Sequence, residues 1–89
     1  MRTVRLDGAI MTNKETAHSY IKEQLAIPSY LGHNLDALYD ALSVYDKEVS
    51  LILINKPELM KHLGPYGERL VHTFWDVEKV NQNVAFKVI

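Results

Sequence analysis

The sequence has no cysteine among its 89 residues, and only four glycines and three prolines. The lack of cysteine excludes disulfide bonds, thiolate metal sites and cysteine nucleophiles. No apolar stretch approaches the roughly 20 residues that a membrane-spanning helix needs, and residues 1–10 lack the apolar core of a signal peptide. We therefore expect a cytoplasmic protein that makes no membrane contact and whose fold depends on packing alone.

The length and composition are those of one folded domain, to which we assign residues 1–89. Hydrophobic residues make up 47% of the chain and charged residues 24%, close to the averages of soluble globular domains, which argues against disorder. The sequence also lacks repeats, low-complexity tracts and Pro/Gly/Ser-rich linkers.

Basic residues are missing from one long segment. Residues 23–46 contain no lysine or arginine but four acids, Glu23, Asp36, Asp40 and Asp46, although the net charge of the chain is only −1. Such a segment would attract a basic partner locally, and it would not bind nucleic acid.

The spacing of apolar residues predicts three strands and four helices. We expect strands at residues 4–6, 49–54 and 84–89, and helices at about 13–26, 35–45, 56–64 and 66–80. The first helix would begin with a capping box at Thr12 and Glu15 and stop before Pro28, and Asn34 would cap the second. The continuous apolar run at 49–54 is typical of a strand buried on both faces. The order β-α-α-β-α-α-β predicts an α/β fold with a small three-stranded parallel sheet, whose helices can all lie on one side.

The helix expected at residues 35–45 has two distinct faces. Its apolar arc consists of Leu35, Leu38, Ala41, Leu42 and Tyr45. A second, contiguous stripe contains Asp36, Tyr39, Asp40 and Ser43 and faces away from the core. Two carboxylates four residues apart repel each other, by a few tenths of a kcal/mol, and a partner's cations would relieve this repulsion.

This stripe has two readings. A solvated helix face carries polar residues of this kind, and Asp36 suits the positive end of the helix dipole in the first turn. Exposed tyrosines at positions 30 and 39 instead favour a binding surface, because protein interfaces are enriched in tyrosine and hot spots combine aromatic and charged side chains.

The segment Tyr30–Leu42, YLGHNLDALYDAL, resembles the signature Y-x-G-x-N-L-D-A-L-W/Y-D-A-L of the barstar family. Those proteins are intracellular inhibitors of secreted bacterial ribonucleases and have a three-stranded parallel sheet packed with helices. The resemblance implies a barstar-like fold, no enzymatic activity and no cofactor. It also implies a barnase-like secreted ribonuclease or related toxin as partner, and a free protein that we expect to be a monomer.

The resemblance further implies roles for individual residues. Asp40 would be the anchor, with its carboxylate in the place of a substrate phosphate. Asp36 would pair with a second cationic group at the rim of the partner's site. Tyr30 would stack on the partner's catalytic histidine, and Tyr39 would take the place of the family's tryptophan.

The remaining binding residues implied by the resemblance lie at the periphery. Gly32 and Asn34 would make loop contacts, and Ser43 and Tyr45 would lie at the edge of the interface. Asp76 aligns with a peripheral glutamate of the family. These five complete the predicted protein-binding set.

The four histidines, His18, His33, His62 and His72, do not have metal-ligand spacing, so we expect no metal site. We expect protonation of His33, beside the proposed surface, to weaken binding to a basic partner. Trp75 is assigned either to the core or to an extension of the interface.

Three other functions remain to be weighed. A helix-turn-helix reading of residues 13–45 conflicts with the absence of bases from its second helix. An enzyme built on Asp36 and Asp40 would need a cleft or a metal for these carboxylates. A barstar-like binding or immunity module for another toxin or a regulatory partner stays open, because a fold does not determine a target.

Overall fold

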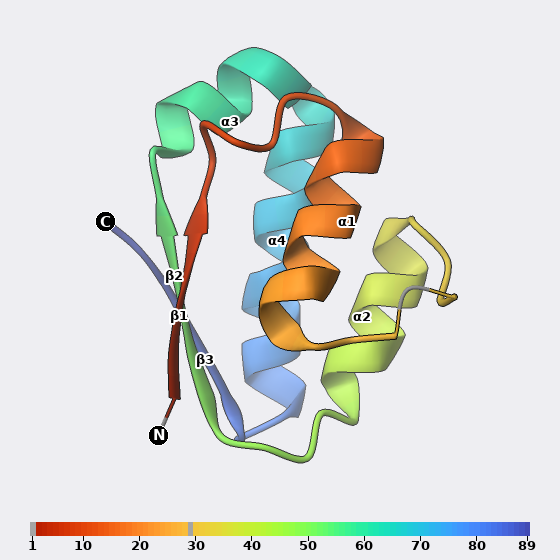
Figure 1. Cartoon of the computed structure of the whole chain (residues 1–89). Helices are drawn as coiled ribbons and strands as arrows, with labels where there is room; N and C mark the ends of the chain where they lie inside the picture. The colour runs from red at the N-terminus through yellow and green to blue at the C-terminus, as the bar shows by residue number, and fades with distance from the viewer. Residues whose placement is uncertain (1, 29) are drawn as a thin grey trace.

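The sheet consists of three parallel strands, β1 (Arg2–Asp7), β2 (Val49–Ile54) and β3 (Val84–Val88), in the order β1-β2-β3. The computed structural model describes residues 2–28 and 30–89, and Figure 1 shows the strands side by side. In the register, Leu51 of the central strand pairs with Val4 of β1 and Phe86 of β3. The predicted α/β class, element order and parallel pairing are confirmed.

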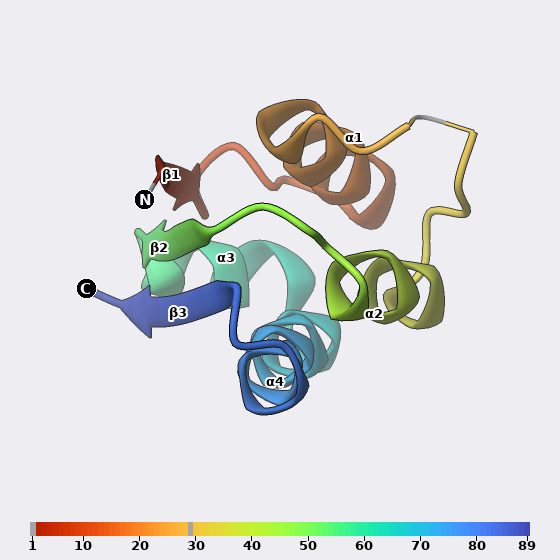
Figure 2. The ribbon, with the colours of Figure 1, turned by 90° about the horizontal axis from the view of Figure 1, so that it is seen from below.

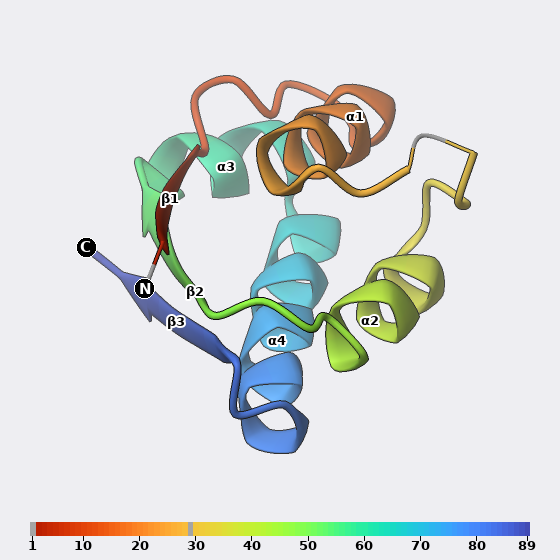
Figure 3. The ribbon, with the colours of Figure 1, turned by 60° about the horizontal axis from the view of Figure 1, so that its bottom comes forward.

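The helices are α1 (Lys14–Leu25), α2 (Leu35–Ser43), α3 (Lys56–Leu63) and α4 (Pro65–Val80). Figure 2 shows α1, α2 and α4 on the same side of the sheet, while α3 lies at the end where β1 and β2 finish. Helix α2 packs along α4 and lies farther from the sheet than α1 or α4 (Figure 3). One side of α2 therefore lies at the surface opposite the sheet.

The central strand β2 is buried on one face only. Val49, Leu51 and Leu53 are buried beneath the helices, whereas the alternate residues Ser50, Ile52 and Ile54 are half-buried. The prediction of burial on both faces is therefore wrong, because all helices that cover the sheet lie on one side. Only the neighbouring strands shield the apolar side chains of the open face.

The first helix has a different N-cap from the one predicted and ends, as predicted, before Pro28. Asn13, not Thr12, is its N-cap, and its side chain accepts a hydrogen bond from the amide of Thr16 at 2.8 Å. Both residue types make good caps, and the helix simply starts one residue later. Its C-cap is Ala26, which has a left-handed backbone with φ of 56°, so the helix has already ended before Pro28.

Gly8 lies where the turn after β1 passes against the start of α3. A Cβ atom at this position would lie 2.4 Å from the carbonyl oxygen of Asn55 and 2.9 Å from Cβ of Leu59. The neighbouring atoms belong to the backbone or to a buried side chain, so they cannot simply swing away.

We therefore expect Gly8→Ala to lower the free energy of unfolding by about 2 kcal/mol or more, as overpacking does. Gly32→Ala is the matched control, because the nearest neighbouring atom to its Cβ would be Nδ2 of Asn34, at 3.2 Å, and this exposed side chain can shift. Urea denaturation followed by circular dichroism measures both variants. Equal stability of the two variants would contradict the packing argument.

Candidate protein-binding site

Helix α2 presents two carboxylates to solvent. Leu38 and Leu42 are buried beneath the helix, while Asp36 and Asp40 are exposed one turn apart. Within residues 2–28 and 30–89, neither carboxylate lies within ion-pairing distance of a basic side chain. The fold thus holds two free acids on one face of a helix that packing has fixed.

The loop before α2 presents the most exposed aromatic side chain of the described chain. Tyr30 is 85% exposed, which agrees with its predicted accessibility. Asn34 caps α2, because its Oδ1 accepts a hydrogen bond from the amide of Ala37 at 2.8 Å. Gly32 lies near the same side chain, and a Cβ there would come 3.2 Å from Nδ2 of Asn34. The cap thus fixes Asn34 to the first turn of the acidic helix.

Tyr39, Ser43 and Tyr45 are less exposed than the acids. All three are half-buried, and the rings of Tyr39 and Tyr45 pack against the core. The Ser43 hydroxyl donates to the carbonyl oxygen of Tyr39 at 2.6 Å, and the Tyr45 hydroxyl donates to that of Leu25 at 3.0 Å. The expectation of a fully exposed Tyr39 is wrong, because this position borders the apolar arc and its ring can lie back on the core.

Asp76 is exposed on α4, the helix that packs along α2. No hydrogen bond or ion pair between described residues joins it to the other predicted binding residues. Its neighbour Trp75 is half-buried and meets Phe86 edge-to-face, with ring centroids 4.6 Å apart. The structure therefore supports the core reading of Trp75, and the binding role of Asp76 stays a prediction.

Two buried polar side chains hold the ends of this site, and the sequence patterns did not identify either of them. Lys22 is 3% exposed, and its Nζ donates to the carbonyl oxygens of Leu31 and Gly32. Burial lowers the pKa of Lys22, and the charge of Glu15 opposes this shift. The sequence signal for this burial is the position of Lys22, four residues after His18 and one after Ile21, within the buried face of α1.

At the other end, Asn81 holds the carboxyl end of α2. It is 8% exposed, and its Nδ2 donates to the carbonyl oxygens of Leu42 and Tyr45 at 2.8 and 3.0 Å. The bond to Leu42 satisfies a carbonyl group of the last turn of α2, and the bond to Tyr45 holds the chain just after the helix. The helix ends at Ser43, two residues before the predicted position.

His18 and His33 lie against each other between α1 and the loop. Their rings stack with centroids 6.3 Å apart, and Nδ1 of His33 lies 2.8 Å from Oε1 of Glu15. His18 is 1% exposed, its Nε2 is hydrogen-bonded to the Tyr66 hydroxyl at 2.6 Å, and its Nδ1 has no partner among the described residues. Loss of solvation lowers the pKa of His18, and the charges of His33 and Lys22 act in the same direction while Glu15 opposes them.

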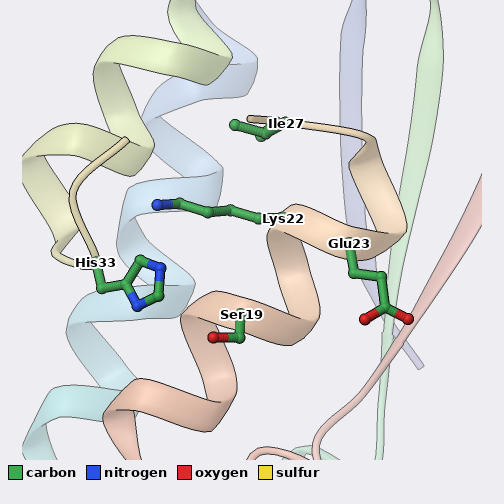
Figure 4. Close-up of a pocket in the computed structure, with 5 residues that line it drawn as sticks. All are labelled: Ser19, Lys22, Glu23, Ile27 and His33. Atoms are coloured by element: carbon green, nitrogen blue, oxygen red, sulfur yellow. The ribbon is translucent and has the colours of Figure 1, made fainter. Parts of the chain in front are cut away.

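A pocket of about 470 Å³ lies beside this cluster, lined by Ser19, Lys22, Glu23, Ile27 and His33. Figure 4 shows Ser19 and Lys22 on the side of α1 that faces His33, whereas Glu23 points away from it. Among the described residues, no group of three or more His, Asp or Glu side chains could hold a metal ion. No helix in the described part of the chain is long and apolar enough to cross a bilayer.

Comparison with known proteins agrees with this geometry. A family profile described as Barstar (barnase inhibitor) matches residues 1–89. The chain belongs to the barstar family. It is also 32% identical over 90 residues to a protein of Bacillus subtilis (strain 168) named "Putative ribonuclease inhibitor YrdF", a match that covers 100% of this chain and 98% of that protein. Fold, length and sequence thus place the acidic helix within a barstar-family domain.

We expect the buried His18 to make stability fall with acidification. Because its pKa is lowered in the folded state, its contribution is complete above its ordinary value of 6.5 and declines as the pH falls below that value. The slope for one proton is at most about 1.4 kcal/mol per pH unit. Urea denaturation between pH 7.5 and 5 should show a weaker decline in His18→Gln than in wild type, whereas exposed His62→Gln should follow wild type. Parallel curves for wild type and His18→Gln would contradict this assignment.

We expect Asn81→Leu to lower the free energy of unfolding by about 2 kcal/mol or more, since it removes a buried donor to the carbonyl oxygens of Leu42 and Tyr45 and the acceptor of the Asn83 amide. The exposed neighbour Gln82 supplies the control, and Gln82→Leu should change stability by less than about 0.5 kcal/mol. Thermal and urea denaturation measure both variants. If Asn81→Leu is as stable as wild type, Asn81 does not hold the helix.

Proposed function

We propose that this protein inhibits a secreted, barnase-like bacterial ribonuclease by binding its active site one-to-one. Helix α2 and residues 30–34 would enter the site, with Asp40 in the place of a substrate phosphate. The observation that carries the proposal is the pair of exposed carboxylates at Asp36 and Asp40, which have no ion-pair partner among the described residues, together with the exposed Tyr30 in the loop before the helix. The barstar-family match over residues 1–89 supports a ribonuclease as the partner.

The chemistry of a ribonuclease site favours a carboxylate at this position. An enzyme that cleaves RNA binds phosphate with cationic side chains, and a carboxylate accepts charge-assisted hydrogen bonds from the same donors. Asp40 lies on a helix whose other face is buried, so little conformational freedom would be lost on binding. The inhibitor would act by occupying the site, and it would perform no reaction itself.

The distribution of charge supports a basic partner. The segment 23–46 carries four acids and no lysine or arginine, while the rest of the chain has more bases than acids. Attraction would therefore be local to α2 and its flanks. We assign the protein to the cytoplasm of a bacterium, where it would protect the producing cell as an immunity protein.

The near-neutral net charge of −1 leaves one other candidate in place. A partner other than a ribonuclease, such as a different toxin or a regulatory protein, could use the same acidic face. Such a partner would still bind through Asp40, but no ribonuclease would be inhibited.

Inhibition assays with purified secreted bacterial ribonucleases, barnase among them, test the proposal. We expect stoichiometric loss of RNA cleavage with wild type, and inhibition at least about 100-fold weaker with Asp40→Ala, because a desolvated cation of the partner would lose its counter-charge. Glu58→Ala removes an equal charge from an exposed position on α3 and should inhibit like wild type.

Circular dichroism should confirm that all three proteins are folded. Absence of inhibition across the panel would overturn the ribonuclease assignment. Inhibition that is equal for Asp40→Ala and wild type would overturn the phosphate-mimic role of Asp40.

A further inference from the structure

The loop before α2 has little backbone structure of its own. Residues 30–34 include three predicted binding residues, Tyr30, Gly32 and Asn34. Among the described residues, the one backbone hydrogen bond donated within residues 30–33 runs from the amide of Leu31 to the carbonyl oxygen of Pro28, at 3.3 Å. A segment so weakly bonded would sample many conformations unless side chains fixed it.

Lys22 supplies these missing contacts from below. Its Nζ donates to two successive carbonyl oxygens of the loop, those of Leu31 and Gly32, the second at 2.9 Å. Figure 4 shows the side chain extending from α1 between Ile27 and His33, whereas Glu23 points away from them. Fixing two adjacent carbonyl groups fixes the peptide planes between Leu31 and His33.

The same face of α1 makes a second contact with the loop. Glu15, seven residues before Lys22 and so two helical turns away on the same face, lies 2.8 Å from Nδ1 of His33. His18 lies between them on this face and stacks on the His33 ring. Glu15, His18 and Lys22 therefore form a continuous polar surface on which the loop rests.

Burying an ammonium group at this position costs free energy of folding. Lys22 is 3% exposed and has no ion-pair partner among the described residues. Taking a charge out of water is unfavourable, and apolar side chains of similar volume usually serve stability as well or better. The lysine ammonium instead orients the loop, because its donors determine where the carbonyl groups of Leu31 and Gly32 point.

We infer that Lys22 is a positioning residue of the binding surface: it holds residues 30–34 in one conformation, so that Tyr30 and Asn34 are presented ready to bind. The inference rests on the proposed function. It explains the buried lysine through preorganisation, which strengthens binding because the loop need not be ordered when the partner arrives.

The first test uses the free protein and needs no partner. Lys22→Met keeps an unbranched side chain of similar length and removes the donors, Lys22→Arg keeps charge and donors, and Lys61→Met makes the same charge change at an exposed position on α3. We expect the backbone amide order parameters of residues 31–33, measured by NMR relaxation, to fall below about 0.6 in Lys22→Met, with those of β2 and α4 unchanged near about 0.85. Lys22→Arg and Lys61→Met should resemble wild type.

Two results of this test would overturn the inference. Order parameters in the loop that equal those of wild type would show that Lys22 does not order it. Lower order parameters in every element, or failure of Lys22→Met to fold, would show that Lys22 stabilises the whole domain and has no specific effect on the loop.

The second test measures binding to an inhibited ribonuclease by a double-mutant cycle. We expect Lys22→Met to weaken binding about 10-fold or more, and to have little further effect when Tyr30→Ala is already present. In the Asp40→Ala background its full effect should remain, because Asp40 is held by α2. Equal effects in both backgrounds would overturn the positioning role. If no ribonuclease binds, the proposed function fails, whereas the relaxation experiment still decides whether Lys22 orders the loop.

Discussion

Asn81 holds the carboxyl end of α2 through two hydrogen bonds from its side-chain amide, to the carbonyl oxygens of Leu42 and Tyr45 at 2.8 and 3.0 Å. The acidic face depends on this attachment, because α2 packs along α4 and lies away from the sheet. Leu42 itself is buried in the core and sets how closely the helix packs. At the other end of the helix Lys22 binds the preceding loop. Apolar packing thus sets the distance of α2 from the core, while polar side chains at its two ends set its orientation.

This arrangement follows from the narrow sheet. Parallel strands require crossover connections, and the connection from β1 to β2 contains both α1 and α2. Side chains also occupy backbone groups at both edges: the amide of Asp7 donates to the Tyr20 hydroxyl at 3.0 Å, and that of Phe86 donates to Oε2 of Glu78 at 2.9 Å. These contacts oppose the addition of a further strand at either edge. The sheet edges and the outward side of α2 are separate surfaces. A partner that binds the outward side of α2 would therefore not compete with a strand added at these positions.

The sequence predicted the parts of this structure that depend on local periodicity. The order of all seven elements, the parallel sheet and the Asn34 cap are as expected. The prediction for the burial of β2 was wrong, because the number of layers over a strand depends on how the helices fold back onto the sheet. An apolar run in the sequence does not indicate that number. Tyr39 was assigned to solvent for a related reason, since its angle on the helix does not reveal where its ring lies. The sequence did not predict the roles of Lys22 and Asn81, because their acceptors are backbone carbonyl groups 9 and 39 residues away. Every residue type has such a carbonyl group, so no sequence pattern marks the acceptor.

The buried polar groups also bear on how a nearly neutral protein would recognise the basic partner that we propose. With a net charge of −1, the whole molecule exerts little long-range attraction, so the affinity for such a partner would come from contacts made by the acidic segment. Such contacts are effective only if the carboxylates and Tyr30 are already in position, because every residue ordered on binding subtracts from the affinity. Stability alone does not favour a lysine at position 22, because an apolar side chain there would avoid the cost of burying a charge. We interpret Lys22 and Asn81 as the means by which a small core gives one orientation to the proposed binding face, and this orientation compensates for the weak overall charge.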